Sequence, residues 1–134
     1  MNFSQLLIEL GIEKTEIMNQ FNGKKAPLER LLFKFPEGKI FGDFYLAYHE
    51  NRLDDLTDSV VSLQKISCKL GFKTLYDFCS KMLLDFSDEP KKLHDDFSNI
   101  CLEYEHLALC INTYLGKSTE TPVEFTLIKE TFLD

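Results

Sequence analysis

The stretch LDDLTDSVVSLQKISCKLGFKTLYDFC, residues 53–79, decides the fold of this chain. When it is placed on a helical wheel at about 100° per residue, one narrow stripe forms at a helical spacing. The stripe consists of Leu53, Leu56, Val60, Leu63, Ser67 and Leu70. The outward side carries Asp54, Asp58, Val61, Lys65 and Cys68. The pattern predicts a central helix with a buried stripe, on whose open face Val61 is a lone apolar side chain.

Length and charge limit the possible functions. At 134 residues the chain is most simply one domain, long enough to build a core. Its 22 acidic and 15 basic residues give a net charge of −7, which disfavours non-specific binding to nucleic acid or to an anionic membrane. No apolar run is long enough to span a bilayer. The N-terminal sequence carries Glu9 and no basic region ahead of its apolar residues, unlike a signal peptide, so we expect a cytoplasmic protein.

Short helices are predicted at the N-terminal end of the chain. Residues 3–9 form the first, with Ser4 as its cap, and Gly11 ends it. Gly23 ends the second, and Pro27 suits the first turn of a third helix. The front part of the chain is therefore expected to contain two short helices ahead of the longer ones.

Pro36 and Gly38 interrupt the third helix, because proline removes a backbone donor and clashes with the preceding turn. We expect a kink or a brief break there. The apolar pattern of the next helix consists of Ile40, Phe44 and Ala47 on one face, flanked by Phe41 and Tyr48. Asn51 caps or precedes the central helix, whose Asp54 and Asp55 suit the positive end of its dipole.

Two further helices are predicted after Gly71. The apolar stripe of the first consists of Leu75, Phe78, Cys79, Met82 and Phe86. A turn at residues 87–90 separates it from the last helix, expected at about residues 91–115. The inward face of that last helix consists of Leu93, Phe97, Ile100, Tyr104, Leu107, Ala108, Ile111 and Leu115. This is the clearest 3.6-residue period in the chain, and Gly116 ends it.

Four long amphipathic helices with short connections fit an all-α fold, an antiparallel four-helix bundle with the two short helices over one end. We expect the bundle to occupy residues 1–116 and a C-terminal tail to occupy residues 117–134. Val123, Phe125 and Leu127 alternate with polar residues in the tail, as in a strand. Such a segment could lie along the bundle, fray, or add to the sheet edge of a partner.

The run V-V-S-L-Q-K-I-S-C-K-L-G-F, residues 60–72, resembles the centre of a histidine-containing phosphotransfer (HPt) domain. That family typically reads x-H-T-L-K-G-x-x-x-N-L-G-A, followed by an amphipathic helix. Leu63, the Leu70–Gly71 pair and the apolar spacing after it match. The front of the family is matched in order by Gly11, Ile12, Phe21, Gly23, Leu31, Leu32 and Phe35. The resemblance covers about residues 11–115 and implies a helical bundle that docks on a response-regulator receiver domain.

The functional positions of the family differ in this chain. Val61 stands where the phospho-accepting histidine would be, Gln64 replaces a lysine, and Lys65 replaces a glycine. Nucleophilic transfer needs an attacking lone pair of suitable basicity, which valine lacks, and Ser62 has no base near it in the sequence. The resemblance therefore implies the scaffold without its chemistry, and we expect no enzyme and no cofactor.

Cysteine and histidine offer no clear reactive or metal-binding motif. The cysteines are Cys68, Cys79, Cys101 and Cys110. They form no CxxC pair and are expected to be core or boundary residues, since no ligand spacing of a zinc site is present. His94 and His106 flank the last apolar stripe and are expected to be exposed or boundary residues. His49 is expected to be a surface histidine, with a displaced phospho-acceptor as the alternative.

These observations lead to two hypotheses of different classes. In the first, an inactive HPt-like protein binds a receiver domain or another two-component protein, such as a histidine kinase component, as adaptor, competitor or sequestering factor. Its expected contact residues are Asp58, Val61, Gln64, Lys65, Cys68, Phe41 and Tyr45. In the second, the bundle serves an unrelated protein interaction or self-association, because all three functional residues are lost and a fold alone does not fix a function.

Overall fold

The computed structural model describes residues 1–116, and every regular element among them is helical. The α-helices are α1 (Phe3–Glu9), α2 (Lys14–Gln20), α3 (Lys25–Lys34), α4 (Lys39–His49), α5 (Leu53–Leu70), α6 (Lys73–Asp88) and α7 (Leu93–Leu115). Two short 3-10 helices are η1 (Phe35–Glu37) and η2 (Pro90–Lys92). The all-α prediction is confirmed for this part of the chain, whereas the tail expected at residues 117–134, with Val123, Phe125 and Leu127, lies outside the described residues.

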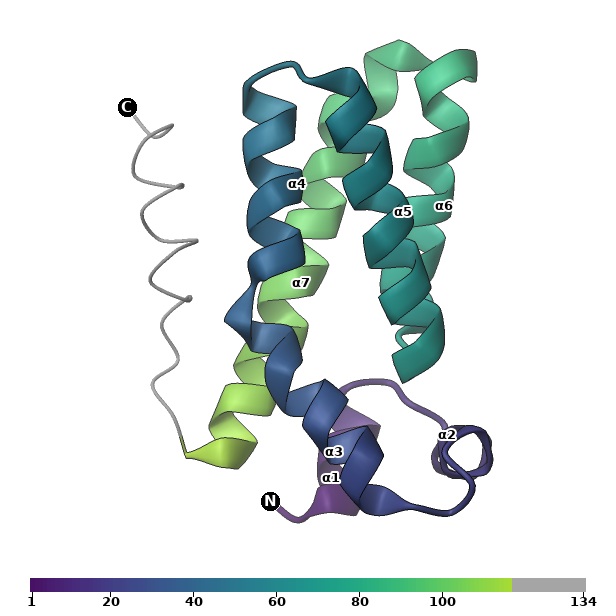
Figure 1. Ribbon diagram of the computed structural model, residues 1–134, viewed down its shortest axis with the longest axis vertical. Helices are drawn as coiled ribbons and strands as arrows, with labels where there is room; N and C mark the ends of the chain where they lie inside the picture. Colours follow the sequence, from purple (N-terminus) through teal and green to yellow (C-terminus); the bar gives the residue numbers. More distant parts are fainter. Residues whose placement is uncertain (117–134) are drawn as a thin grey trace.

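The four longest helices, α4 to α7, lie side by side along the long axis of the molecule (Figure 1). α5 packs against both α4 and α6, and α6 also packs against α7. α1, α2 and α3 lie together at the end of the molecule where α7 finishes (Figure 1), and α1 and α3 contact α7. None of the described helices has an apolar stretch long enough to cross a bilayer.

Aromatic side chains join α4 to α7. The rings of Phe41 and Tyr104 stack with their centroids 4.0 Å apart and their planes 2° from parallel. Phe44 stacks on Phe97 at 5.2 Å. The Tyr104 hydroxyl donates a hydrogen bond to the Phe35 carbonyl at 3.2 Å, which supplies the partner that a buried aromatic hydroxyl needs. One side chain of α7 thus contacts both α4 and η1.

The break predicted at Pro36 and Gly38 is present as η1. Pro36 lies inside this short helix, and Gly38 follows it with a φ of 77°. This is the left-handed region, in which a Cβ atom would clash with the backbone, so glycine suits the position. The break turns the chain from α3 into α4.

The connection between α5 and α6 also depends on a glycine. Gly71 has a φ of 76°, and a Cβ atom placed there would lie 3.4 Å from Ile12 Cγ2 and 3.6 Å from Ile17 Cδ1. Ile12 and Ile17, before and within α2, therefore lie at van der Waals distance from this connection, and the left-handed φ of Gly71 is what favours glycine there.

One predicted cap differs from that in the structure, and the prediction that Asn51 caps or precedes α5 is met in its second form. Asn2, and not Ser4, caps α1: its side chain accepts from the Gln5 backbone N–H, and the Gln5 side chain accepts from the Asn2 backbone N–H, both at 2.8 Å. Asn51 precedes α5 with a φ of 54°, and Arg52 is the N-cap residue. Ser4 lies inside the first turn of α1, beyond the position from which a side chain can cap it.

Two predicted core positions are exposed. Leu53 is 58 % exposed, because it is the first residue of α5 and lies one turn ahead of Leu56, the first buried position of that helix. Ile40 is 39 % exposed, because Phe41 and Phe44 define the core-facing side of α4. Both differences concern the first turn of a helix.

Candidate functional site

The outward face of α5 is the candidate site, and the structure places most of the predicted contact residues on it. Asp58, Lys65 and Cys68 are exposed, and Val61 and Gln64 are half-buried. Val60 and Leu63 are buried on the opposite side, with 0 % and 1 % exposure. The rotation of α5 therefore agrees with the helical wheel: Val61 lies at the edge of the open face, where a partner can reach it.

Gln64 is held in place by α6. Its Nε2 atom donates to Ser80 Oγ at 3.0 Å, and Ser80 Oγ donates in turn to the Tyr76 carbonyl at 2.9 Å. The Gln64 side chain therefore ties α5 to α6. Because it is fixed in the free protein, it loses little freedom when a partner covers it.

Phe41 and Tyr45 were expected to border the same surface, and this prediction is wrong. Phe41 is 1 % exposed and Tyr45 is 8 % exposed. The Phe41 ring stacks on Tyr104, and the Tyr45 ring lies 5.4 Å from that of Phe97, both partners being residues of α7. These side chains face the core, so they support α4 and are not available to a partner.

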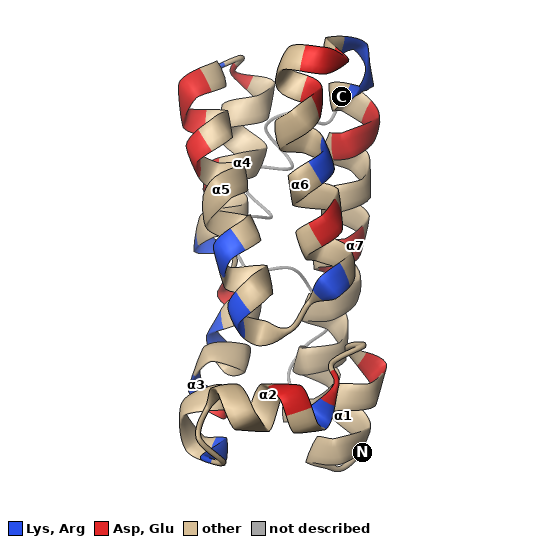
Figure 2. Ribbon diagram, turned by 90° about the vertical axis from the view of Figure 1, so that its right-hand side faces the viewer, with Lys and Arg blue, Asp and Glu red and all other residues tan. Residues whose placement is uncertain are grey.

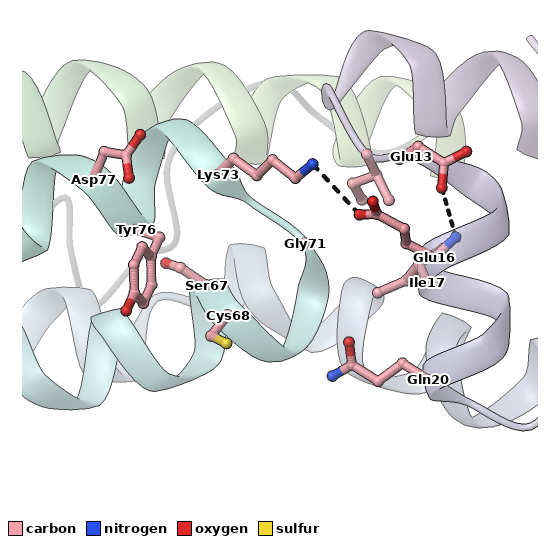
Figure 3. A pocket seen from close by; sticks show the side chains of 11 residues that line it. Glu13, Glu16, Ile17, Gln20, Ser67, Cys68, Gly71, Lys73, Tyr76 and Asp77 are labelled. Carbon is pink, nitrogen blue, oxygen red and sulfur yellow. Dashed lines mark hydrogen bonds and ion pairs between the residues drawn. The ribbon is translucent and has the colours of Figure 1, made fainter.

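A groove of about 300 Å³ lies beyond the lower end of the α5 face, between α2 and the α5–α6 connection (Figure 3). Ile12, Ile17 and Tyr76 supply apolar surface, and Cys68 belongs both to this groove and to the α5 face. Figure 3 shows Glu16 reaching from α2 toward Lys73, with Oε2 and Nζ 3.4 Å apart. The groove extends the candidate surface from α5 onto α2.

Charge changes sign along the α5 face. Acidic side chains occupy its first half and lysines its second half, as the red and blue segments of α5 show in Figure 2. The exposed members are Asp54, Asp55, Asp58, Lys65 and Lys69. Arg52 neutralises part of the acidic half, because its Nη1 atom lies 2.6 Å from Asp55 Oδ2. Val61 therefore lies between an acidic region and a basic region.

His49 is half-buried, so the expectation of a surface histidine is wrong. Its ring lies 4.5 Å from Tyr45, 5.4 Å from Tyr48 and 5.4 Å from Phe97, measured between centroids. Burial lowers the pKa of the imidazole from its usual value. Attack by His49 on a phosphoryl group would require this aromatic cluster to open, which counts against the displaced phospho-acceptor. His94 and His106 are exposed, as predicted.

The cysteines differ in their environment. Cys68 is exposed, Cys79 is buried, and Cys101 and Cys110 are half-buried. Burial raises the pKa of the Cys79 thiol to about 12, so this side chain stays protonated and behaves as a small apolar residue. Within residues 1–116, no group of three or more His, Cys, Asp or Glu side chains is arranged to hold a metal ion.

Comparisons with protein-family models, with curated proteins and with solved structures found no match for this chain.

Proposed function

We propose that this chain is an antiparallel four-helix bundle of the HPt type that binds a response-regulator receiver domain without transferring a phosphoryl group. Such a protein acts as an adaptor, a competitor or a sequestering factor in two-component signalling. The arrangement of α4 to α7 supports the bundle, because consecutive helices with short connections pack as antiparallel neighbours.

An apolar residue on the α5 face carries the proposal. Val61 lies one helical turn from Asp58 on one side and from Lys65 on the other, so an apolar side chain is surrounded by a polar rim. Protein interfaces are commonly built in this way. A valine can be desolvated by a partner at little cost, and it has no lone pair with which to accept a phosphoryl group. The position suits docking and excludes phosphohistidine chemistry at that residue.

Lys65 supports the same partner class through its charge. It is exposed beside Val61, and its ammonium group can pair with the acidic residues of a receiver's phosphorylation pocket. An exposed ion pair contributes about 0.2–1 kcal/mol, so Lys65 affects the orientation and salt dependence of binding more than its affinity. The groove beyond Cys68 enlarges the footprint, since a stable interface covers about 800 Å² on each partner.

Calorimetric titration of the full chain against a panel of receiver domains tests the proposal, with and without a phosphoryl mimic on each receiver. We expect saturable binding to one receiver, and Val61→Asp weakens it about tenfold or more, because a charge then has to be desolvated at the centre of the contact. Val61→Ile, which keeps the apolar surface, is the matched control and retains binding. Unchanged affinity of a folded Val61→Asp variant, with helicity checked by circular dichroism, contradicts the proposal.

A second candidate function is favoured by two exposed leucine side chains on α7. Leu102 and Leu109 are 67 % and 46 % exposed and lie two turns apart on one side of that helix. Such a surface suits self-association or an unrelated protein partner, to which the segment 117–134 could add contacts. If binding to any partner survives Val61→Asp and is lost on deletion of residues 117–134 or in Leu102→Ser, this second function is supported instead.

A further inference from the structure

Two buried carboxyl groups meet one lysine where α6 packs against the start of α7. Asp85 of α6 is 6 % exposed and Asp96 of α7 is 2 % exposed. Lys81 Nζ lies 2.6 Å from Asp85 Oδ2 and 3.3 Å from Asp96 Oδ1, and the Lys81 side chain remains 50 % exposed. The lysine therefore bridges the two helices from the solvent side of the pair.

The charges of this cluster do not balance when both carboxyl groups are ionised. One ammonium group faces two carboxylates, and Asp96 Oδ2 is buried without a hydrogen bond to any donor. The Asp85 and Asp96 carboxyl groups lie close enough to share a hydrogen bond when one of them holds a proton. An unpaired carboxylate oxygen in a buried position is costly, so a bound proton satisfies both groups at once.

The electrostatic environment assigns that proton to Asp96. Burial, followed by the hydrogen bond with Asp85, raises the pKa of Asp96 to about 6, whereas Lys81 acts in the opposite direction. Hydrogen bonds from Asp96 and then from Lys81 lower the pKa of Asp85. Lys92 of η2 also lowers the pKa of Asp85, so the charged groups that face the pair come from α6 and η2.

We propose that Lys81, Asp85 and Asp96 form a proton-binding site that locks the start of α7 against α6. In the locked state the proton on Asp96 Oδ2 is donated to the Asp85 carboxylate, and Lys81 balances the single remaining negative charge. When that proton passes to solvent, two buried carboxylates face each other with one lysine between them. The contact between α6 and the first turns of α7 then loosens.

The direction of the pH effect follows from proton linkage. The folded protein binds the Asp96 proton more tightly than the unfolded chain does, because the pKa of Asp96 is raised on folding. Stability supplied by this proton is therefore fully present only below the ordinary pKa of an aspartate, about 4, and is lost as the pH rises from there through about 6. This is opposite to an ordinary salt-bridged aspartate, whose contribution is lost on acidification.

Amide hydrogen exchange of the full chain tests the site. After correction for intrinsic exchange, we expect residues 97–101, whose amide N–H groups are the first of α7 to have an acceptor within that helix, to exchange about tenfold faster at about pH 7.5 than at about pH 5. Asp96→Asn removes this dependence, because its amide nitrogen donates to Asp85 at any pH. Asp95→Asn changes an exposed carboxylate in the same turn of α7 and keeps the wild-type profile. A pH profile identical in wild type and Asp96→Asn overturns the proposal.

A measurement on the unmodified protein covers the case in which Asp96→Asn does not fold. Carbon NMR of the aspartate carboxyl groups gives the titration midpoint of each residue directly. A midpoint for Asp96 near pH 6 supports the site. A midpoint for Asp96 in the usual range of an exposed aspartate, about 4, overturns it.

Discussion

Helix α7 is held by two neighbours through different physical interactions. On the α4 side the contact is aromatic, with Phe41 stacked on Tyr104 and Phe44 on Phe97. On the α6 side, at the start of α7, the contact contains the buried ionisable pair Asp85 and Asp96. The stacked rings of the first contact carry no group that changes charge near neutral pH, whereas the carboxyl pair of the second does.

The difference shows how one helix can combine permanent and adjustable contacts. Stacked rings gain dispersion energy and lose water-exposed apolar area, and neither depends on pH. A buried carboxyl pair is stable only with the right number of protons. We therefore expect the aromatic contact to supply most of the stability of α7 and the ionisable contact to supply its response to pH.

The largest expected effect comes from breaking the aromatic contact. Phe41→Ala lowers the free energy of unfolding by about 3–5 kcal/mol, because it leaves a cavity against Tyr104. Chemical denaturation at about pH 5 and at about pH 7.5 checks this, and we expect the same loss at both values. Phe41→Leu is the control, with a smaller loss. A loss that changes strongly with pH would show that the two contacts are not independent.

Lys81→Met tests the ionisable contact between α6 and α7. Removing the ammonium group leaves two carboxyl groups without their common cation, which raises the pKa of both. We expect a lower denaturation midpoint than wild type at about pH 7.5 and a smaller difference at about pH 5, where Asp96 is protonated. Lys91→Met, in the neighbouring η2, is the matched control and leaves the midpoint unchanged at both values. An equal effect of Lys81→Met at both pH values would contradict this account.

The same contrast separates what the sequence could predict from what it could not. The inward face of α7 was predicted correctly at Phe97, Ile100 and Tyr104, because a long regular period fixes both the helix and its rotation. Aromatic residues occur around much of α4, so periodicity alone did not show that Phe41 and Tyr45 face α7. Packing against α7 determines which side of α4 faces the core.

Buried charged residues, and contacts between residues far apart in the chain, are harder still to predict from the sequence. Asp85 and Asp96 belong to a residue type that marks exposed positions in a hydrophobicity pattern, and only their tertiary contact with Lys81 explains their burial. The groove beside Cys68 depends on the close approach of Ile12 to Gly71, residues far apart in the chain. The helical wheel of α5 was enough to predict the candidate face, but it carries no information about α2, which packs beside that face.

Gly71→Ala tests a third contact, the one that positions α2. A left-handed backbone costs a non-glycine residue about 1–2 kcal/mol, and the new Cβ atom would lie in van der Waals contact with Ile12 at 3.4 Å. Gly23 has a similar φ of 73° with no atom within 4 Å of its would-be Cβ, so Gly23→Ala reports the backbone cost alone. We expect thermal unfolding to show similar losses for the two variants, because the added contacts at Gly71 are of ordinary van der Waals length. A clearly larger loss for Gly71→Ala would mean that Ile12 and Ile17 leave no room for a side chain there.

The smallest expected effect concerns a neutral hydrogen bond of α6, which serves as a comparison for the ionisable carboxyl pair. Gln64→Ala removes the hydrogen bond to Ser80 between α5 and α6, a loss of about 0.5–1 kcal/mol. Because neither partner ionises near neutral pH, denaturation should show the same loss at about pH 5 and about pH 7.5. A double-mutant cycle with Ser80→Ala isolates the pair. If this neutral contact proved as sensitive to pH as the α6–α7 contact, the sensitivity would belong to α6 as a whole. If the Gln64–Ser80 contact is insensitive to pH, the pH sensitivity resides in the carboxyl pair. α6 then has a permanent contact on its α5 side and a pH-dependent one on its α7 side.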